Sequence, residues 1–147
     1  MCFSKSLKMA AVAAGMWLTA TSFAVTMMLV NLAKIVELAD KAFVGTVTSV
    51  KVVNTASGWA DEIAVKVSEP VLGAVQAGET VVWQQYRSNE TIPQQGVPEY
   101  HEGEECLVFL AGKATPTGLQ AAVGLGQGSF RVHRNTQTGQ VLARNAF

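Results

Sequence analysis

The sequence predicts a small all-β protein, a barrel of short strands with one helix at its N-terminal end. Three observations support this fold class. From Phe43 onward, apolar residues recur with a period of two, as they do along strands buried on one face. The apolar segments are short and rich in β-branched residues, which favour strands. Gly, Pro, Asn, Asp and Ser separate these segments, and such residues are typical of turns.

Residues 31–42, NLAKIVELADKA, predict the helix, with Asn31 as its N-cap. An alternative is that this segment is a tail of the preceding region without fixed structure. In the helical interpretation, four apolar residues at helical spacing form one buried stripe. These residues are Leu32, Ile35, Val36 and Ala39.

The segment FVGTVTSVKVV, residues 43–53, predicts a long first strand in which Gly45 marks a bend or bulge. NTASG then supplies a turn. The alternation of Ile63, Val65 and Val67 with polar neighbours predicts a returning strand, so these segments form a hairpin.

Residues 69–79 predict a connection, because Pro70 and two glycines interrupt it. TVVWQQY, residues 80–86, predicts a third strand. Residues 87–103 form the longest stretch without periodicity, and loops of that length are often functional.

CLVFLAG, residues 106–112, is apolar on both faces and predicts a central strand. GLQAAVGLG (118–126) and SFRVHR (129–134) are further candidate strands, and QVLAR (140–144) closes a last hairpin after the turn NTQTG. Five to seven strands with a long bent first strand predict an OB-like barrel, closed or partly open. The sequence indicates one such domain, residues 25–147.

Residues 1–24 resemble a signal peptide. Lys5 and Lys8 precede an apolar run, and Ser22 and Ala24 are small residues at the positions of a cleavage site, so Val25 would begin the mature chain. An uncleaved anchor formed by residues 9–30 is the alternative, since about 20 apolar residues can span a bilayer. We therefore expect a periplasmic or secreted protein or, in the alternative, one anchored to the inner membrane.

The charge balance of the expected mature chain excludes one class of partner. Removal of Lys5 and Lys8 leaves nine basic against eleven acidic residues, so no electrostatic feature indicates nucleic acid. Trp59, Trp83 and Tyr86 could stack on bases, but we expect them to be core aromatics. Cys106 is the one cysteine left, so the mature domain has no internal disulfide.

Five segments in order resemble a family of small exported bacterial proteins over roughly residues 32–145. They are LADKAFVGTVTSVK, VSEPVLGAVQAGETVVW, EGEECLVFLAG, VGLGQGSFRV and TGQVLARN. This resemblance implies a fold and a compartment more than an activity.

The opening ADKAFVGTVTSV also resembles the first strand of netrin-like domains and tissue inhibitors of metalloproteases, which are OB barrels. This resemblance implies protein binding, with a protease as one possible class of partner. Those inhibitors chelate the protease zinc through an N-terminal cysteine. Here Val25 is the expected terminus and Cys106 lies deep in the chain, so that mechanism does not carry over.

EYHEGEECLVFL, residues 99–110, brings together His101, Cys106 and several carboxylates. Their spacing matches no closed zinc motif. Glu104 and Glu105 would raise the pKa of the Cys106 thiol, which disfavours a nucleophile. We therefore interpret the segment as an acidic turn entering a buried strand.

The last hairpin is basic, because it contains Arg131, His133, Arg134 and Arg144. The contrast between this basic hairpin and the acidic segment could orient a partner, although a solvated face is the commoner explanation.

Catalytic and phosphate-binding motifs are absent from the sequence, and nothing in it indicates a cofactor or a metal. We expect a non-catalytic exported domain that binds another exported protein or an envelope component. The alternatives are a metal- or thiol-dependent enzyme centred on His101 and Cys106, and a structural envelope protein. The residues expected to contact a partner lie in or beside the long loop: Arg87, Asn89, Glu90, Glu99, Tyr100 and His101.

Overall fold

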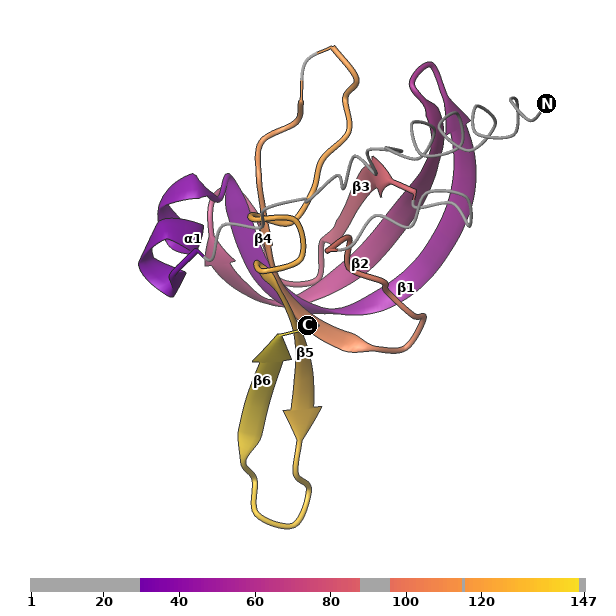
Figure 1. Cartoon of the computed structure of the whole chain (residues 1–147). Helices are drawn as coiled ribbons and strands as arrows, with labels where there is room; N and C mark the ends of the chain where they lie inside the picture. Colours follow the sequence, from indigo (N-terminus) through magenta and orange to yellow (C-terminus); the bar gives the residue numbers. More distant parts are fainter. Residues whose placement is uncertain (1–29, 88–95, 115, 146–147) are drawn as a thin grey trace, which may run out of the picture.

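The computed structural model describes residues 30–87, 96–114 and 116–145 (Figure 1). Six antiparallel strands form one sheet in the order β3-β2-β1-β4-β5-β6. The all-β class, the strand number and the N-terminal helix are thereby confirmed. The elements are α1 (Leu32–Leu38), β1 (Lys41–Thr55), β2 (Gly58–Leu72), β3 (Thr80–Tyr86), β4 (Glu105–Leu110), β5 (Ser129–Arg134) and β6 (Val141–Asn145).

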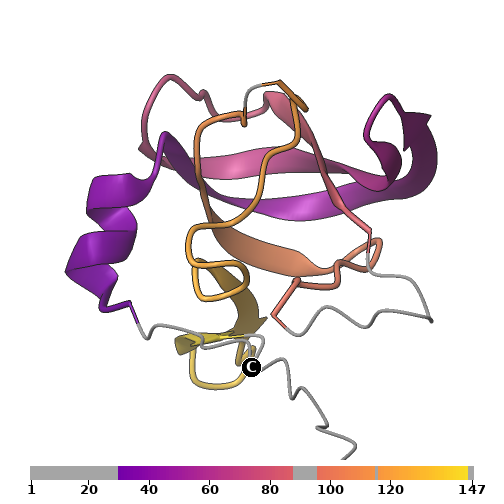
Figure 2. The ribbon, with the colours of Figure 1, turned by 45° about the horizontal axis from the view of Figure 1, so that its top comes forward.

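The sheet is strongly curled but is not closed into a barrel (Figure 1). Its end strands, β3 and β6, pair with a neighbouring strand on one side only within the described residues. The segment between β4 and β5 crosses the strands (Figure 2) and makes one backbone bond to β3 and two to Phe109 of β4, from Val123 N to Phe109 O at 2.9 Å and from Phe109 N to Gly128 O at 2.8 Å. The bond to β3 runs from Gln120 N to Gln84 O at 2.8 Å, and within the segment Ala111 N donates to Ala121 O at 2.9 Å.

The hairpin of β1 and β2 is the longest feature of the sheet, with 15 residues in each strand. A two-residue turn joins Thr55 to its partner Gly58. The pairing register shifts between Val44 and Gly45, which confirms the predicted bulge. A Cβ at Gly45 would lie 2.5 Å from the backbone oxygen of Lys66, so only glycine fits this close approach.

Helix α1 begins as predicted, because the Asn31 side chain accepts a hydrogen bond from Lys34 N at 2.9 Å. Half of its predicted buried stripe is confirmed, since Ile35 is buried and Ala39 packs against the smaller core, but Leu32 and Val36 are 59% and 43% exposed. The helix is too short to cover the sheet with a whole face. It ends at Leu38 rather than near residue 42, since Asp40 N already bonds to Leu110 O of β4.

Two apolar clusters lie on opposite faces of β4. Cys106, Val108 and Leu110 join the larger core inside the curl, whereas Phe109 joins a smaller core beneath α1. The central position of β4, between β1 and β5, agrees with its prediction as a strand that is apolar on both faces.

Two further predictions are wrong, one about where a strand ends and one about a strand that does not form. Residues 69–72 belong to β2 rather than to a connection, because Pro70 lies where β2 pairs with β1 alone and needs no second partner. Residues 118–126 form no strand. Ala122 makes one isolated bridge to Leu110, and the chain then turns, with Leu125 in the left-handed region at φ 66°.

Candidate functional site

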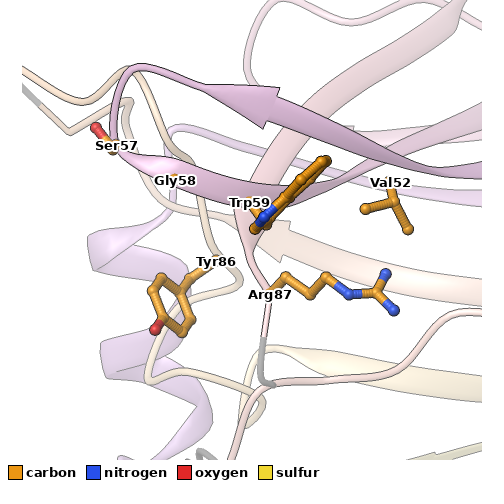
Figure 3. Close-up of a pocket in the computed structure, with 6 residues that line it drawn as sticks. All are labelled: Val52, Ser57, Gly58, Trp59, Tyr86 and Arg87. Atoms are coloured by element: carbon orange, nitrogen blue, oxygen red, sulfur yellow. The ribbon is translucent and has the colours of Figure 1, made fainter. Parts of the chain in front are cut away.

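A groove of about 520 Å³ lies at the tip of the β1–β2 hairpin, where β3 ends (Figure 3). Trp59 at the start of β2 lies opposite Asn54, and Tyr86 at the end of β3 lies opposite Ala60. The turn between β1 and β2 requires positive φ at Gly58, which adopts 105°. The lining residues are Val52, Ser57, Gly58, Trp59, Tyr86 and Arg87.

The apolar side chains of this groove are exposed. Trp59 is 62% exposed, Val52 51% and Tyr86 39%. The expectation that Trp59 and Tyr86 are core aromatics is therefore wrong, whereas Trp83, at 2% exposed, confirms it. Within the described residues, β4 pairs with β1 only from Lys41 to Thr46, so no further strand lies beside β1 at the hairpin tip, where Val52 lies.

A second cavity of about 410 Å³ lies next to this groove, and Arg87 lines both. Arg87 Nη1 donates at 2.6 Å to Oδ1 of Asp61, which lines the second cavity, so the two side chains form a charged pair there. The cavity is more polar than the groove, since Asp61, Glu99 and His101 contribute to its walls.

Gln85 forms part of the wall of this cavity although its side chain is almost fully buried, with 3% exposed. Its Nε2 donates to Pro98 O at 2.9 Å, which fixes the orientation of the amide. Its Oε1 has no hydrogen-bond partner among the described residues. A buried acceptor without a donor is costly by about 1–3 kcal/mol, so the cavity favours a ligand that supplies a donor.

The sequence-predicted contact residues are divided by the structure. Arg87, Glu99 and His101 lie around the second cavity, as does Tyr100, but the Tyr100 side chain is only 8% exposed. Its ring contacts Trp83 edge-on, with 5.4 Å between centroids, and burial raises the pKa of its hydroxyl far above the ordinary range. Tyr100 thus takes part in the core. Asn89 and Glu90 lie outside the described residues.

The segment EYHEGEECLVFL does not bring His101 and Cys106 into one site. His101 has 67% of its side chain exposed, whereas Cys106 is 2% exposed. Burial, followed by the charges of Glu104 and Glu105, raises the pKa of the Cys106 thiol to about 12. As predicted, the thiol is shielded and protonated at neutral pH. Among the described residues, no three His, Cys, Asp or Glu side chains are grouped so that they could hold a metal ion.

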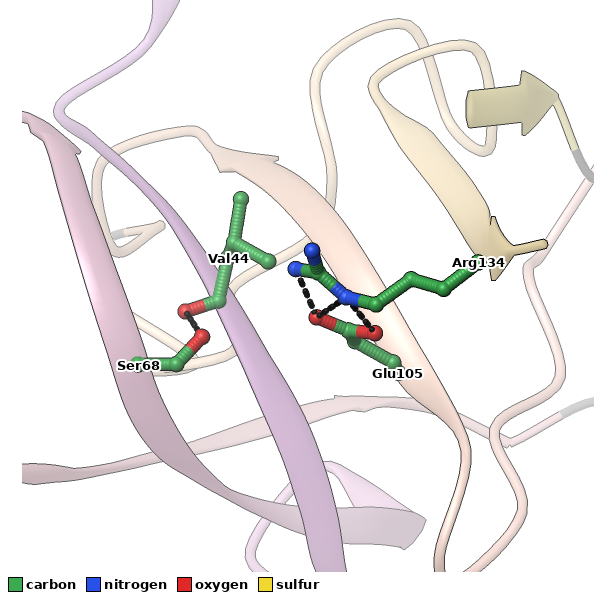
Figure 4. A network of polar contacts seen from close by, with 4 residues as sticks. All are labelled: Val44, Ser68, Glu105 and Arg134. Carbon is green, nitrogen blue, oxygen red and sulfur yellow. Dashed lines mark hydrogen bonds and ion pairs between the residues drawn. The ribbon is translucent and has the colours of Figure 1, made fainter. Parts of the chain in front are cut away.

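The acidic and basic segments noted in the sequence face each other across β4 and β5. Arg134 binds Glu105 through two nitrogens, with Nη2 at 2.6 Å from Oε1 and Nε at 2.8 Å from Oε2 (Figure 4). Hydrogen bonding from Arg134 lowers the pKa of the Glu105 carboxyl. Arg131 Nε lies 2.5 Å from Glu104 Oε1, an ion pair whose N–H is not aligned for a hydrogen bond. Much of the apparent charge asymmetry is thus used within the sheet.

Sequence reasoning missed the groove at Trp59. One signal could have found it, because the first two strands are much longer than the CLVFLAG segment that covers them. Side chains at the hairpin tip, including Val52 and Trp59, must then extend beyond that cover.

Comparison of the chain with models of known protein families, with curated proteins and with solved structures gave no match. Across residues 30–87, 96–114 and 116–145, no helix is both long enough and apolar enough to cross a membrane.

Proposed function

We propose that this chain is a non-catalytic exported domain that binds another exported protein or a cell-envelope component through the groove at Trp59. Its sheet order, with β1 between β2 and β4, is compatible with an OB-like barrel that remains partly open. The features of residues 1–24 support export to the periplasm or beyond, and an anchor at residues 9–30 is the alternative.

The observation that carries this proposal is the exposure of Trp59 beside Tyr86 and Arg87 in one groove. Trp, Tyr and Arg are the residues most often responsible for binding energy at protein interfaces. An exposed Trp side chain also offers a large apolar area that water solvates poorly. A surface of this kind favours binding over a purely structural role in the envelope.

The enzyme alternative centred on His101 and Cys106 has less support. A nucleophilic cysteine needs an accessible thiolate and a nearby base. The exposure of His101 and the burial of Cys106 provide neither. The similarity to netrin-like domains and metalloprotease inhibitors adds a protease to the classes of partner worth testing.

The groove can be tested by affinity capture. The domain spanning residues 25–147 is immobilised and exposed to the envelope fraction of its own organism, and bound components are quantified by mass spectrometry. We expect at least one component to be retained by the wild type and reduced about tenfold or more by Trp59→Ala. Val82→Ala is the matched control, because Val82 is 49% exposed but lies outside the groove. Equal retention by all three proteins would refute the proposal.

A further inference from the structure

We infer that the edge of β1 from Thr48 to Thr55, which pairs with no strand other than β2 in the described residues, accepts an extended polypeptide strand from the partner. Two side chains of this strand, two residues apart, enter the groove at Trp59 and the cavity at Gln85. The inference rests on the proposed function and specifies its ligand as a peptide segment in β-conformation.

The first support is the pairing of β1. β4 pairs with it only from Lys41 to Thr46, and Val47 makes two further bonds to the chain before β4. Beyond Val47, β1 pairs with β2 alone in the described residues. Between Thr48 and Thr55 the sequence contains no proline and one charged residue, Lys51, so few of the usual features that block strand addition are present.

The second support is the direction of the backbone groups. Val50 N donates to the side chain of Glu102 at 3.4 Å, so this amide points away from β2. No register shift follows Ser49, and backbone groups alternate along a strand. The amides and carbonyls of Val52 and Asn54 therefore also point outward, where an added strand could bond to them.

The third support is the spacing of the two cavities along this edge. Val50 lines the cavity at Gln85, and Val52 lines the groove at Trp59. Side chains of an added strand project to the same face at every second residue. A strand paired with β1 would thus present successive same-face side chains to the two spaces, which is the arrangement by which added strands gain specificity.

The chemistry of the two spaces sets the preferred side chains. The groove offers Trp59 and Val52 and suits an aliphatic or aromatic residue. The cavity lining includes two acceptors, the unpaired Oε1 of Gln85 and the carboxylate of Glu99, beside the donor side chains of Arg87 and Tyr100. A Lys, Arg, Asn or Gln side chain supplies the donor that Gln85 lacks. The expected motif is an apolar residue and a donor residue separated by one position.

The test uses 12-residue peptides displayed on phage and selected on the domain of residues 25–147. We expect the enriched peptides to share the motif of an apolar and a donor residue. The best one is synthesised unmodified, with N-methyl groups on the amides facing β1, and with N-methyl groups on the alternate amides. Affinity measured by calorimetry should fall about tenfold or more for the first methylated form and little for the second.

Two variants of the domain complete the test. Val52→Pro removes the outward amide, and the β1–β2 ladder does not use that amide, so proline is compatible with the edge. It should weaken peptide binding about tenfold relative to Val52→Ala, which lacks the same side chain but keeps the amide. The peptide should also slow amide hydrogen exchange at Val52 and Asn54 in the wild type, a readout that needs no variant.

Three outcomes would overturn the inference. If Trp59→Ala abolishes peptide binding while both methylated peptides and Val52→Pro bind normally, the groove binds its ligand without strand addition, and the proposed function survives. If no peptide is enriched, the ligand is not a peptide strand, and the envelope capture alone decides the role of the groove. If sedimentation shows a dimer that Val52→Pro dissociates, the edge is occupied by a second copy of this chain.

Discussion

The root and the tip of the β1–β2 hairpin consist of similar β-branched sequence but differ in what covers them. At the root, Phe43 and Val65 are fully buried and Val47 is 1% exposed, because β4 lies alongside and core residues pack inside the curl. At the tip, Val52 and Trp59 are 51% and 62% exposed. Burial thus depends on the reach of the neighbouring strand more than on the side chain itself.

This difference also separates stability from binding. The root joins the main core and holds the hairpin in place, so the tip can present apolar side chains to solvent without needing them for folding. Substitutions at the two ends should therefore have effects of different kinds, and the following predictions start with the largest.

Phe43→Ala should cause the largest loss of stability. Phe43 is fully buried and contacts Trp83 edge-on, with ring centroids 6.3 Å apart. Its truncation should lower the free energy of unfolding by about 3–5 kcal/mol, whereas Trp59→Ala should change it by less than about 1 kcal/mol. Urea denaturation followed by circular dichroism measures both. A loss of several kcal/mol for Trp59→Ala would show that the tip is part of the core.

The root was predictable from sequence, and the tip was not. Period-two alternation identified Ile63, Val65 and Val67, and Gly45 marked the bulge, because these signals are local. The unequal lengths of the segments signal that the hairpin extends beyond β4, but the exposure of Trp59 depends on the pairing register between β4 and β1, which one sequence does not reveal. The segment 99–110 shows the converse. Its His and Cys residue types indicated chemistry, but alternation correctly placed Cys106 in the core.

Cys106→Ser should have the second-largest effect. The thiol lies in the larger core, and a hydroxyl buried there without a partner should cost about 1–3 kcal/mol. Cys106→Ala adds no polar group to the core and should leave peptide or partner binding unchanged. In the wild type, thiol reagents at neutral pH should react only after denaturation, as a spectrophotometric thiol assay can show. Rapid labelling of the native domain would instead support a reactive cysteine.

Alkaline pH should weaken the root by an amount that grows with each pH unit above 9. The pKa of Cys106 rises from an ordinary value of 9.0 to about 12 on folding. The folded state therefore holds this proton more tightly, so its contribution to stability is complete below pH 9 and is lost as the pH rises toward 12. Above pH 9 the free energy of unfolding should fall by up to about 1.4 kcal/mol per pH unit.

The control for this pH dependence is Cys106→Ala, in which the slope should be shallower between pH 9 and 10.5. Part of the slope should remain, because burial also raises the pKa of Tyr100. Identical slopes in the two proteins would mean that Cys106 is solvated in the folded state.

The smallest effect should come from the ion pair between Glu105 and Arg134, where the root meets the β5–β6 hairpin. The pair is bidentate, but its side chains are 24% and 52% exposed, so solvent screens much of the attraction. Glu105→Gln should lower stability by less than about 1 kcal/mol at low salt and by almost nothing in about 1 M salt.

The contribution of this ion pair should also depend on acid. Because Arg134 lowers the pKa of Glu105, the contribution is present at neutral pH and is lost as the pH falls through the lowered pKa. Glu99→Gln, at the second cavity, is the matched control, and its effect on stability should not depend on salt. A Glu105→Gln effect that persists in high salt would mean that this side chain stabilises the fold by packing rather than by charge, and the covered root would then extend one residue further along β4 than the burial of Cys106 indicates.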